Sequence, residues 1–382
     1  MRLNTLMKRI CFVVSEPMTA RSFLLDHIQA LAEVYEVTLV ANFSDAQLSE
    51  SIPGVSVLKK IPIVRSIKPI ADLYALILLF SFFRKEKFSA VHSVTPKAGL
   101  LAMLAGWVAR VPCRFHTFTG QVWVNKHGAL KWLLMSLDKL VFSCSSSVLV
   151  DSPSQRDFLI LNDVISLEKS TVLGDGSICG VNSTRFRIDD DGRNELRKSL
   201  NLPDDAFLFL FLGRINRDKG IDELILAFSS LQYVANSAYL MLVGPEEDDV
   251  LNRHKGLLSG FGEHYIRKGY TSTPQVYMAA ADVFCLPSHR EGFGSVILEA
   301  AATGTPAIGS NIYGITDAIV NGVTGLLHNV GDAEDLSIKM NILLSDKEFT
   351  AHLGQSAYSR ALTDFSVDRI VQQMVDYYRV RV

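Results

Sequence analysis

Paired cysteines, clustered metal ligands and a surplus of positive charge are all missing from this sequence. The five cysteines stand singly, with no C-x-x-C pair and no Cys/His cluster at zinc spacing. An odd, dispersed set suits a reducing compartment, so we expect buried thiols rather than disulfides. With 38 basic and 40 acidic residues the formal net charge is −2, and no general positive field favours nucleic acid as a partner.

Long apolar runs are missing as well. The run at residues 10–14 is shorter than the ~7–15 residues of a signal-peptide core and predicts a first buried strand instead. The longest apolar stretch, residues 73–83, falls well short of the ~20 residues that span a bilayer. Basic residues, including Lys68 and Arg84, flank it on both sides. A buried helix fits this pattern, and so does a helix that touches a membrane surface.

Strand-like and helix-like segments alternate along the chain in two series. A hydrophobic fraction of 48% indicates well-formed cores, and 382 residues are too many for one core. Short apolar runs separated by helical patterns predict α/β domains with doubly wound parallel sheets. We expect domains at 1–184 and 185–364, a polar linker at 185–206, and a helix at 365–382 that packs back on the first domain. Typical expected elements are strands at 36–41, 147–150, 207–212 and 265–268, and helices at 22–33 and 98–109.

The first motif that carries chemistry follows the strand expected at 207–212. Gly213 lets the chain turn without a Cβ clash, and Arg214 and Lys219 then lie on a loop that opens a helix. A guanidinium and an ammonium beside a strand end make a clamp for a diphosphate, whose charge must be neutralised when it leaves a sugar nucleotide. A solvated basic surface loop is the alternative interpretation.

The second motif is a glycine-containing loop that also opens a helix. The N–H groups of Gly294, Ser295 and Val296 are expected at the helix N-terminus, which attracts anions. Glu291 lies in the loop, where it can face a sugar hydroxyl or a developing positive charge. Glu299 lies over one turn into the helix, where its carboxylate can accept hydrogen bonds from ribose hydroxyls.

Together these motifs resemble the retaining glycosyltransferases of family 4, which have the GT-B fold of two Rossmann-like domains facing a central cleft. The stretches 213–220 and 291–299 match the basic clamp and the E-x7-E motif of that family. In the N-terminal half, residues 95–99 and 116–123 resemble members that assemble surface polysaccharides on lipid carriers.

The resemblance implies roles for five residues. Arg214 and Lys219 hold the donor diphosphate, Glu299 holds the ribose, and Glu291 lies near the transferred sugar. His116 occupies the place of a histidine that contacts the donor sugar from the N-terminal domain.

Four further residues are weaker candidates. Tyr270 follows a strand, where it is either near the nucleotide base or simply buried. Lys97 is a candidate for an acceptor phosphate, and Thr119 and Gly120 belong to the acceptor side. The segment 15–23 lacks the Gly-Gly pair that family members often carry after the first strand, so no phosphate contact is assigned to it.

The expected reaction moves a hexose-type sugar, N-acetylated or not, from a UDP-sugar donor to a polyprenyl-diphosphate-linked saccharide, with retention. We expect no cofactor, no essential metal, no nucleic acid partner, and a peripheral location on the cytoplasmic face of the inner membrane. Three alternatives stay open: a sugar-nucleotide epimerase, a non-catalytic nucleotide-sugar-binding module and a dinucleotide oxidoreductase. The last is disfavoured because no G-x-G-x-x-G loop follows the first strand.

Overall fold

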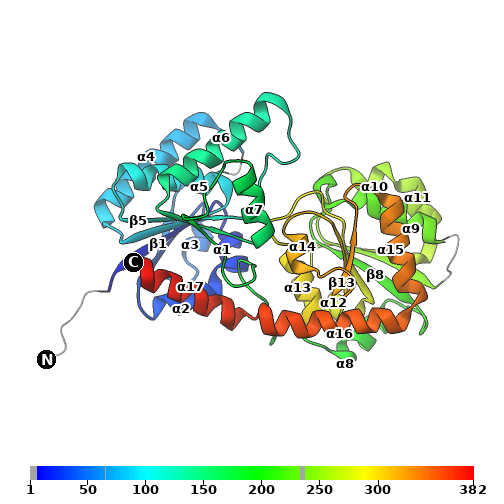
Figure 1. The fold of residues 1–382 in the computed structure, drawn as a ribbon. Helices are drawn as coiled ribbons and strands as arrows, with labels where there is room; N and C mark the ends of the chain where they lie inside the picture. Colours follow the sequence, from blue (N-terminus) through cyan, green and yellow to red (C-terminus); the bar gives the residue numbers. More distant parts are fainter. Residues whose placement is uncertain (1–6, 65, 233–236) are drawn as a thin grey trace. The chain divides into compact units, whose positions relative to one another are not determined.

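The chain folds into two units in the computed structural model, which describes residues 7–64, 66–232 and 237–382. Unit 1 comprises Met1–Cys179 and Val367–Val382, and unit 2 comprises Gly180–Ser366 (Figure 1). The C-terminal helix therefore belongs to unit 1. The polar segment 185–206, predicted as a linker, lies inside unit 2 and contains a helix, α8 (Asp190–Ser199).

Unit 1 is built on a seven-stranded sheet in which all neighbours are parallel, in the order β3-β2-β1-β4-β5-β6-β7. Because β1 has β2 on one side and β4 on the other, the strand order reverses between β1 and β4. The strands are β1 (Arg9–Val13), β2 (Glu36–Ala41), β3 (Val57–Lys60), β4 (Ala90–Val94), β5 (Cys113–Phe118), β6 (Ser147–Val150) and β7 (Ser170–Thr171).

Helices cover both faces of this sheet, as the alternation of its side chains requires. Along β1, Cys11 and Val13 face a core with α4, α5 and α6, whereas Ile10 and Phe12 face a core with α2 and α17. The helices of unit 1 are α1 (Pro17–Phe23), α2 (Leu25–Ala32), α3 (Asp45–Leu48), α4 (Pro69–Glu86), α5 (Pro96–Val108), α6 (Gly128–Cys144), α7 (Pro153–Leu161) and α17 (Val367–Arg381).

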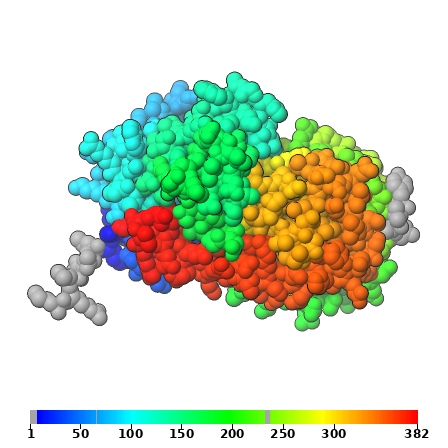
Figure 2. Space-filling model, viewed as in Figure 1, coloured from blue at the N-terminus to red at the C-terminus, as the bar shows by residue number. Residues whose placement is uncertain are grey.

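The C-terminal helix α17 is held to unit 1 by a buried tyrosine. Tyr378 is fully buried, and its hydroxyl lies 2.8 Å from Nδ1 of His92 on β4. Nε2 of His92 lies 2.8 Å from the hydroxyl of Thr117 on β5, so the imidazole bridges helix and sheet. Burial lowers the pKa of His92 to about 3, which keeps this bridge uncharged. Figure 2 shows the red helix on the surface of unit 1.

The long apolar stretch forms part of α4 and is only half buried. Ala75, Leu79 and Phe83 face the core, whereas Ile70 and Leu73 are exposed. The sequence allows either a buried helix or a helix that touches a membrane surface. Neither describes α4 fully, because one side of the helix packs in the core and the other faces solvent. No helix among the described residues is long and apolar enough to cross a bilayer.

Unit 2 repeats the architecture with six parallel strands in the order β10-β9-β8-β11-β12-β13. The order reverses between β8 and β11, and a single core fills both faces. The strands are β8 (Phe207–Leu212), β9 (Ala238–Val243), β10 (Tyr265–Lys268), β11 (Val283–Leu286), β12 (Ala307–Ser310) and β13 (Gly325–His328).

The helices of unit 2 pack in two groups, α8, α12, α13 and α16 in one and α9, α11 and α15 in the other (Figure 1). Besides α8, they are α9 (Ile221–Gln232), α10 (Val250–Arg253), α11 (Lys255–Gly260), α12 (Pro274–Ala280), α13 (Ser295–Ala302), α14 (Ile315–Ala318), α15 (Ala333–Ser345) and α16 (Lys347–Asp364), with 3₁₀ turns η1 (Arg217–Lys219) and η2 (Gly262–His264).

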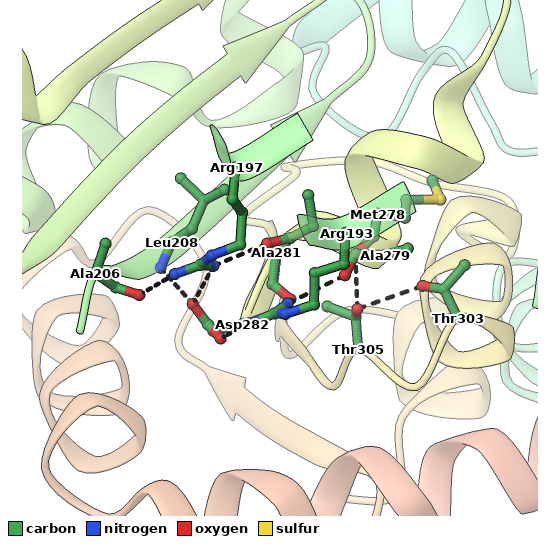
Figure 3. A network of polar contacts seen from close by, with 11 residues as sticks. Arg193, Arg197, Ala206, Leu208, Met278, Ala279, Ala281, Asp282, Thr303 and Thr305 are labelled. Carbon is green, nitrogen blue, oxygen red and sulfur yellow. Dashed lines mark hydrogen bonds and ion pairs between the residues drawn. The ribbon is translucent and has the colours of Figure 1, made fainter. Parts of the chain in front are cut away.

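A carboxylate at the start of β11 ties α8 to the sheet of unit 2 (Figure 3). Asp282 accepts hydrogen bonds from Arg193 at 2.6 Å, Arg197 at 3.2 Å and the backbone N–H of Leu208 at 2.7 Å. The two arginines also donate to carbonyl groups at the end of α12 and just beyond it. The arginines of the polar segment therefore hold α8 against the sheet, which explains why residues 185–206 are not a linker.

The Asp282→Ala variant is expected to lose about 3 kcal/mol of unfolding free energy, because two partly buried guanidinium groups lose their counter-ion. Urea titration followed by circular dichroism measures the change. The exposed Lys198 of the same helix supplies the control, since Lys198→Ala should stay within about 0.5 kcal/mol of the parent. Equal stability of the two variants would show that the Asp282 network is dispensable.

Candidate active site

The two predicted motifs meet where the strand order of unit 2 reverses. β8 and β11 are neighbours, and the loops that follow them, residues 213–220 and 287–294, both leave the carboxyl edge of the sheet. In doubly wound sheets this edge is where ligands bind. The first motif supplies Arg214 and Lys219, and the second supplies Glu291.

The two loops touch through a glycine. Gly220 ends the turn η1 at φ 68°, and a Cβ placed on it would lie 1.9 Å from the carbonyl oxygen of Pro287. Only a residue without a side chain allows this approach. Nearby, the backbone N–H of His289 donates to the carbonyl of Asp218 at 2.9 Å. The backbone of one loop is thus fixed directly against the other.

Lys219 and Glu291 form an ion pair across these loops. Nζ of Lys219 lies 2.5 Å from Oε1 of Glu291, and the hydroxyl of Ser288 donates to the same oxygen at 2.8 Å. Both charged side chains are largely shielded from solvent. The structure therefore brings together two of the predicted residues and adds Ser288, which no sequence pattern had indicated as a partner.

Arg214 pairs with a residue that the sequence analysis missed. Its Nη1 donates to both carboxylate oxygens of Glu247, at 3.0 and 2.8 Å. Glu247 lies beyond β9, 33 residues further along the chain. Only the pairing of β8 with β9 brings the two together, so no local motif could have indicated it.

A helix begins at the position where the sequence predicts an anion-binding helix start. Gly294 precedes α13 at φ 78°, and Ser295 and Val296 are the first two helical residues. Their N–H groups belong to the first turn, which has no carbonyl partner within the helix. Glu299 follows on the same helix. Burial raises the pKa of its carboxyl to about 7, although the positive charge of Arg185 opposes this shift.

Tyr270 follows β10, the edge strand two places from β8. Its side chain is 75% exposed, so it is a surface residue rather than the buried tyrosine that the sequence left open. A role near the nucleotide base remains a prediction for Tyr270.

His116 lies near the end of β5 and is only 1% exposed. Its Nδ1 lies 2.9 Å from the hydroxyl of Ser93, and a Cβ added to Gly99 would lie 2.4 Å from its ring. The ring also meets Phe118 edge-on at 4.6 Å between centroids. Burial lowers the pKa of His116 to about 3, so the imidazole is neutral at physiological pH.

Of the weaker acceptor-side candidates, Lys97 is engaged within unit 1. Its Nζ lies 2.7 Å from Oδ1 of Asp72, and it also donates to the carbonyl of Ser66. Lys97 therefore fastens the start of α4 to the start of α5. Thr119 is partly exposed and Gly120 is buried, both directly after β5.

The glycine-free segment after β1 makes a different contact at the point where the strand order of unit 1 reverses. The hydroxyls of Ser15 and Thr95 lie 3.2 Å apart across the ends of β1 and β4. Thr95 has φ 78°, a conformation that β-branched residues rarely adopt. Such strain often marks a binding site, and sequence could not reveal it because threonine gives no signal for positive φ.

A hollow of about 840 Å³ lies at the opposite, amino-terminal edge of the unit 2 sheet. Its walls include Arg193, Arg197 and Asp282, which are engaged with one another and with backbone carbonyls (Figure 3). Because these charges fix α8, and because ligands of such sheets bind at the carboxyl edge, we place the candidate site at the loops after β8 and β11. Among the described residues no His, Cys, Asp and Glu cluster is arranged to hold a metal ion.

Comparison with known proteins agrees with this geometry. A profile for glycosyl transferases group 1 matches residues 192–360, and one for a glycosyl transferase 4-like domain matches residues 20–176. The capsular polysaccharide biosynthesis glycosyltransferase CapM of Staphylococcus aureus is 30% identical over 319 residues, 83% of each chain. The Escherichia coli UDP-Gal:alpha-D-GlcNAc-diphosphoundecaprenol alpha-1,3-galactosyltransferase is 25% identical over 321 residues, 82% of this chain and 81% of that one.

Among solved structures, Anabaena HepE in complex with UDP superposes with a TM-score of 0.80 at 20% identity, covering 97% of this chain and 100% of HepE. The fold is thus GT-B, with two parallel α/β sheets. The chain belongs to the group 1 glycosyltransferases, family 4. It is a glycosyltransferase, which sets aside the epimerase, oxidoreductase and non-catalytic alternatives, and its relatives include enzymes of capsule and lipid-linked oligosaccharide assembly.

A histidine of the second loop also pairs with a carboxylate near the site. Nε2 of His289 lies 3.0 Å from Oε1 of Glu223 on α9, and this hydrogen bond raises the pKa of His289. A group with a raised folded-state pKa contributes stability that is complete below its unfolded pKa, ~6.5. The contribution is lost as pH rises through the folded-state value.

The stability advantage of the parent over His289→Gln is therefore expected to shrink by about 0.5–1 kcal/mol between pH 6 and pH 8.5. Urea titrations of both proteins across this range measure the difference. An advantage that stays constant with pH would show that the charged form of His289 does not contribute.

Proposed function

We propose that this enzyme transfers a hexose-type sugar, N-acetylated or not, from a UDP-sugar to a polyprenyl-diphosphate-linked saccharide, with retention at the anomeric carbon. The observation that carries the proposal is the arrangement at β8 and β11. Arg214, Lys219 and the start of α13 converge at the sheet edge that binds ligands in such folds. Support for UDP comes from HepE, which was solved with UDP.

The proposed chemistry rests on stabilising the leaving group. As the bond between the anomeric carbon and the diphosphate breaks, negative charge develops on the departing oxygen. Lys219, Arg214 and the N–H groups of Gly294, Ser295 and Val296 neutralise it, and Glu299 accepts hydrogen bonds from the ribose. The departing phosphate takes the proton of the acceptor hydroxyl, which attacks from the same face. No metal has a role in this scheme, so activity should persist in a chelator.

Two residues are assigned to the transferred sugar. They are Glu291 of the loop after β11 and His116 of β5. Nδ1 of His116 is engaged by Ser93, so we assign Nε2 to a sugar hydroxyl. A neutral imidazole suits this contact, since it adds no positive charge beside an oxocarbenium-like centre.

The lipid-linked acceptor is proposed from a relative and from a surface. The name of the Escherichia coli relative gives a diphosphoundecaprenol-linked sugar as its acceptor. On unit 1, α4 and α6 follow β3 and β5, so both helices begin at the carboxyl edge of the sheet. Their first halves carry exposed apolar side chains: Ile70, Leu73, Tyr74 and Ile77 on α4, and Leu130, Trp132 and Leu133 on α6.

Such apolar side chains beside lysines suit the boundary between headgroups and acyl chains of an anionic membrane. Lys68 precedes α4 and Lys131 lies on α6. The proposal thus places the enzyme peripherally on the cytoplasmic face of the cell membrane, with the acceptor edge of unit 1 at the lipid.

The activity test is a donor screen with a lipid-diphosphate-sugar acceptor, in which free UDP and product mass are followed together. One donor is expected to release UDP only when the acceptor is present. Arg214→Ala and Lys219→Ala should each lower kcat/KM for the donor by roughly 10²–10³, the range for loss of a charge-stabilising group. Arg217→Ala, an exposed residue of the same loop, is the matched control. Unchanged turnover of Arg214→Ala, or donor conversion without acceptor, would overturn the proposal.

The membrane test compares two exposed tryptophans at opposite edges of unit 1. Trp132→Ser should weaken flotation with anionic liposomes by about tenfold, because one large side chain no longer enters the lipid. Trp107, 56% exposed at the end of α5, provides the control. Equal effects of Trp132→Ser and Trp107→Ser, or none, would contradict the assigned surface.

A further inference from the structure

The orientation of Arg214 depends on a neighbouring carboxylate. Its side chain is 42% exposed, and an exposed arginine loses much rotamer freedom when it is held in one geometry. We infer that Glu247 is the positioning residue that presents Arg214 to the donor diphosphate, an inference that rests on the proposed role of Arg214. Glu247 would act through the arginine, without touching the donor.

Glu247 is itself held by several contacts. Nδ2 of Asn216 donates to its Oε2 at 2.9 Å, and its backbone N–H donates to the carbonyl of Ile215 at 3.0 Å. The N–H of Ile215 donates in turn to the carbonyl of Pro245 at 2.8 Å. Residues 215 and 246 form a β-bridge. The segment that carries Glu247 is thus joined to the segment that carries Arg214 by both backbone and side chain.

Asn216 connects the contacts around Glu247 to Lys219, the second cation of the site. While its Nδ2 donates to Glu247, its Oδ1 accepts from the backbone N–H of Lys219 at 3.2 Å and caps the turn η1. One buried amide therefore sets both the carboxylate behind Arg214 and the turn that carries Lys219. Asn216 thus helps to set the spacing between Arg214 and Lys219, the two side chains proposed to bind the diphosphate.

The geometry of Arg214 indicates that Glu247 supports the arginine rather than competing with the donor phosphate for it. Both hydrogen bonds to Glu247 run from Nη1. A guanidinium presents N–H groups on Nη2 and Nε as well, and these are not used by Glu247. A phosphate can approach that edge while the carboxylate stays in place. A carboxylate that merely occupied the phosphate position would have to be displaced, against the contacts that fix it.

These two roles predict opposite effects on affinity. If Glu247 positions Arg214, then Glu247→Ala weakens UDP binding by about tenfold, the value of a lost charge-assisted hydrogen bond, and raises the donor KM in proportion. If Glu247 competes with the phosphate, its removal tightens UDP binding. Glu247→Gln keeps one oxygen that accepts from Nη1 and should restore UDP affinity to within about threefold of the parent.

The experiment measures UDP affinity by isothermal titration calorimetry, and donor kcat and KM with acceptor, for Glu247→Ala, Glu247→Gln, Arg214→Ala and the double variant. Asp249→Ala removes the same charge from the same loop and is the control. The double variant should bind UDP no more weakly than Arg214→Ala, because Glu247 acts only through that arginine. Thermal unfolding confirms that each variant is folded.

The outcomes separate this inference from the proposed function. Weak binding by Arg214→Ala with normal or tighter binding by Glu247→Ala overturns the positioning role alone. Normal binding by Arg214→Ala overturns the clamp, and the positioning role with it. A further loss in the double variant shows that Glu247 acts by another route and also overturns the inference.

Discussion

The candidate site depends on one close approach between two loops. At Gly220 the carbonyl of Pro287 lies 1.9 Å from where any other residue would place its Cβ, so a side chain here would force the loops after β8 and β11 apart. Their separation sets the 2.5 Å distance between Lys219 and Glu291. It also sets the contacts of His289 and Arg290 with Asp218. A single backbone contact thereby fixes the spacing of two charges, Lys219 and Glu291, that lie 72 residues apart in the chain.

Sequence reasoning succeeded where burial imposes a pattern. Strands β2, β6 and β8 have the predicted bounds because each is a short, mostly buried apolar run. β10 also has its predicted bounds, although its four residues are only partly buried. β3 escaped prediction since its residues, including Lys59 and Lys60, are mostly exposed and show no buried face. The helix expected at 22–33 is two helices, and the first begins earlier, at Pro17, a residue common at the first helical position. Within the site, the motifs indicated cations and carboxylates, but the Arg214–Glu247 pair depends on strand order, which local sequence does not encode. The Ser288–Glu291 contact lies within one loop and depends on the conformation of that loop.

The two units share a strand order and differ in the chemistry of the edge where it reverses. Unit 2 presents Arg214 and Lys219 there, each paired with a carboxylate. Unit 1 presents the hydroxyls of Ser15 and Thr95, and its Lys97 is committed to Asp72. An edge with cations suits an anionic diphosphate, whereas an edge of hydroxyls suits the neutral hydroxyl groups of a saccharide. This difference fits the proposed division between donor and acceptor, and it gives a physical reason why the glycine pair typical of a phosphate loop is missing after β1.

Each cation of the candidate site is balanced by a carboxylate in this structure. A shielded ammonium such as that of Lys219 is costly without a counter-charge, and Glu291 supplies one in this structure. On the proposed function, the donor diphosphate brings negative charge to the same ammonium, so Lys219 no longer needs Glu291. The carboxylate then keeps its hydrogen bond from Ser288 and is available to the sugar, where positive charge develops. Glu247 differs because Asn216 and the backbone of residue 215 fix it independently of Arg214. On the proposed function, one carboxylate of the site is thus exchangeable and the other permanent, and their contacts in this structure distinguish them.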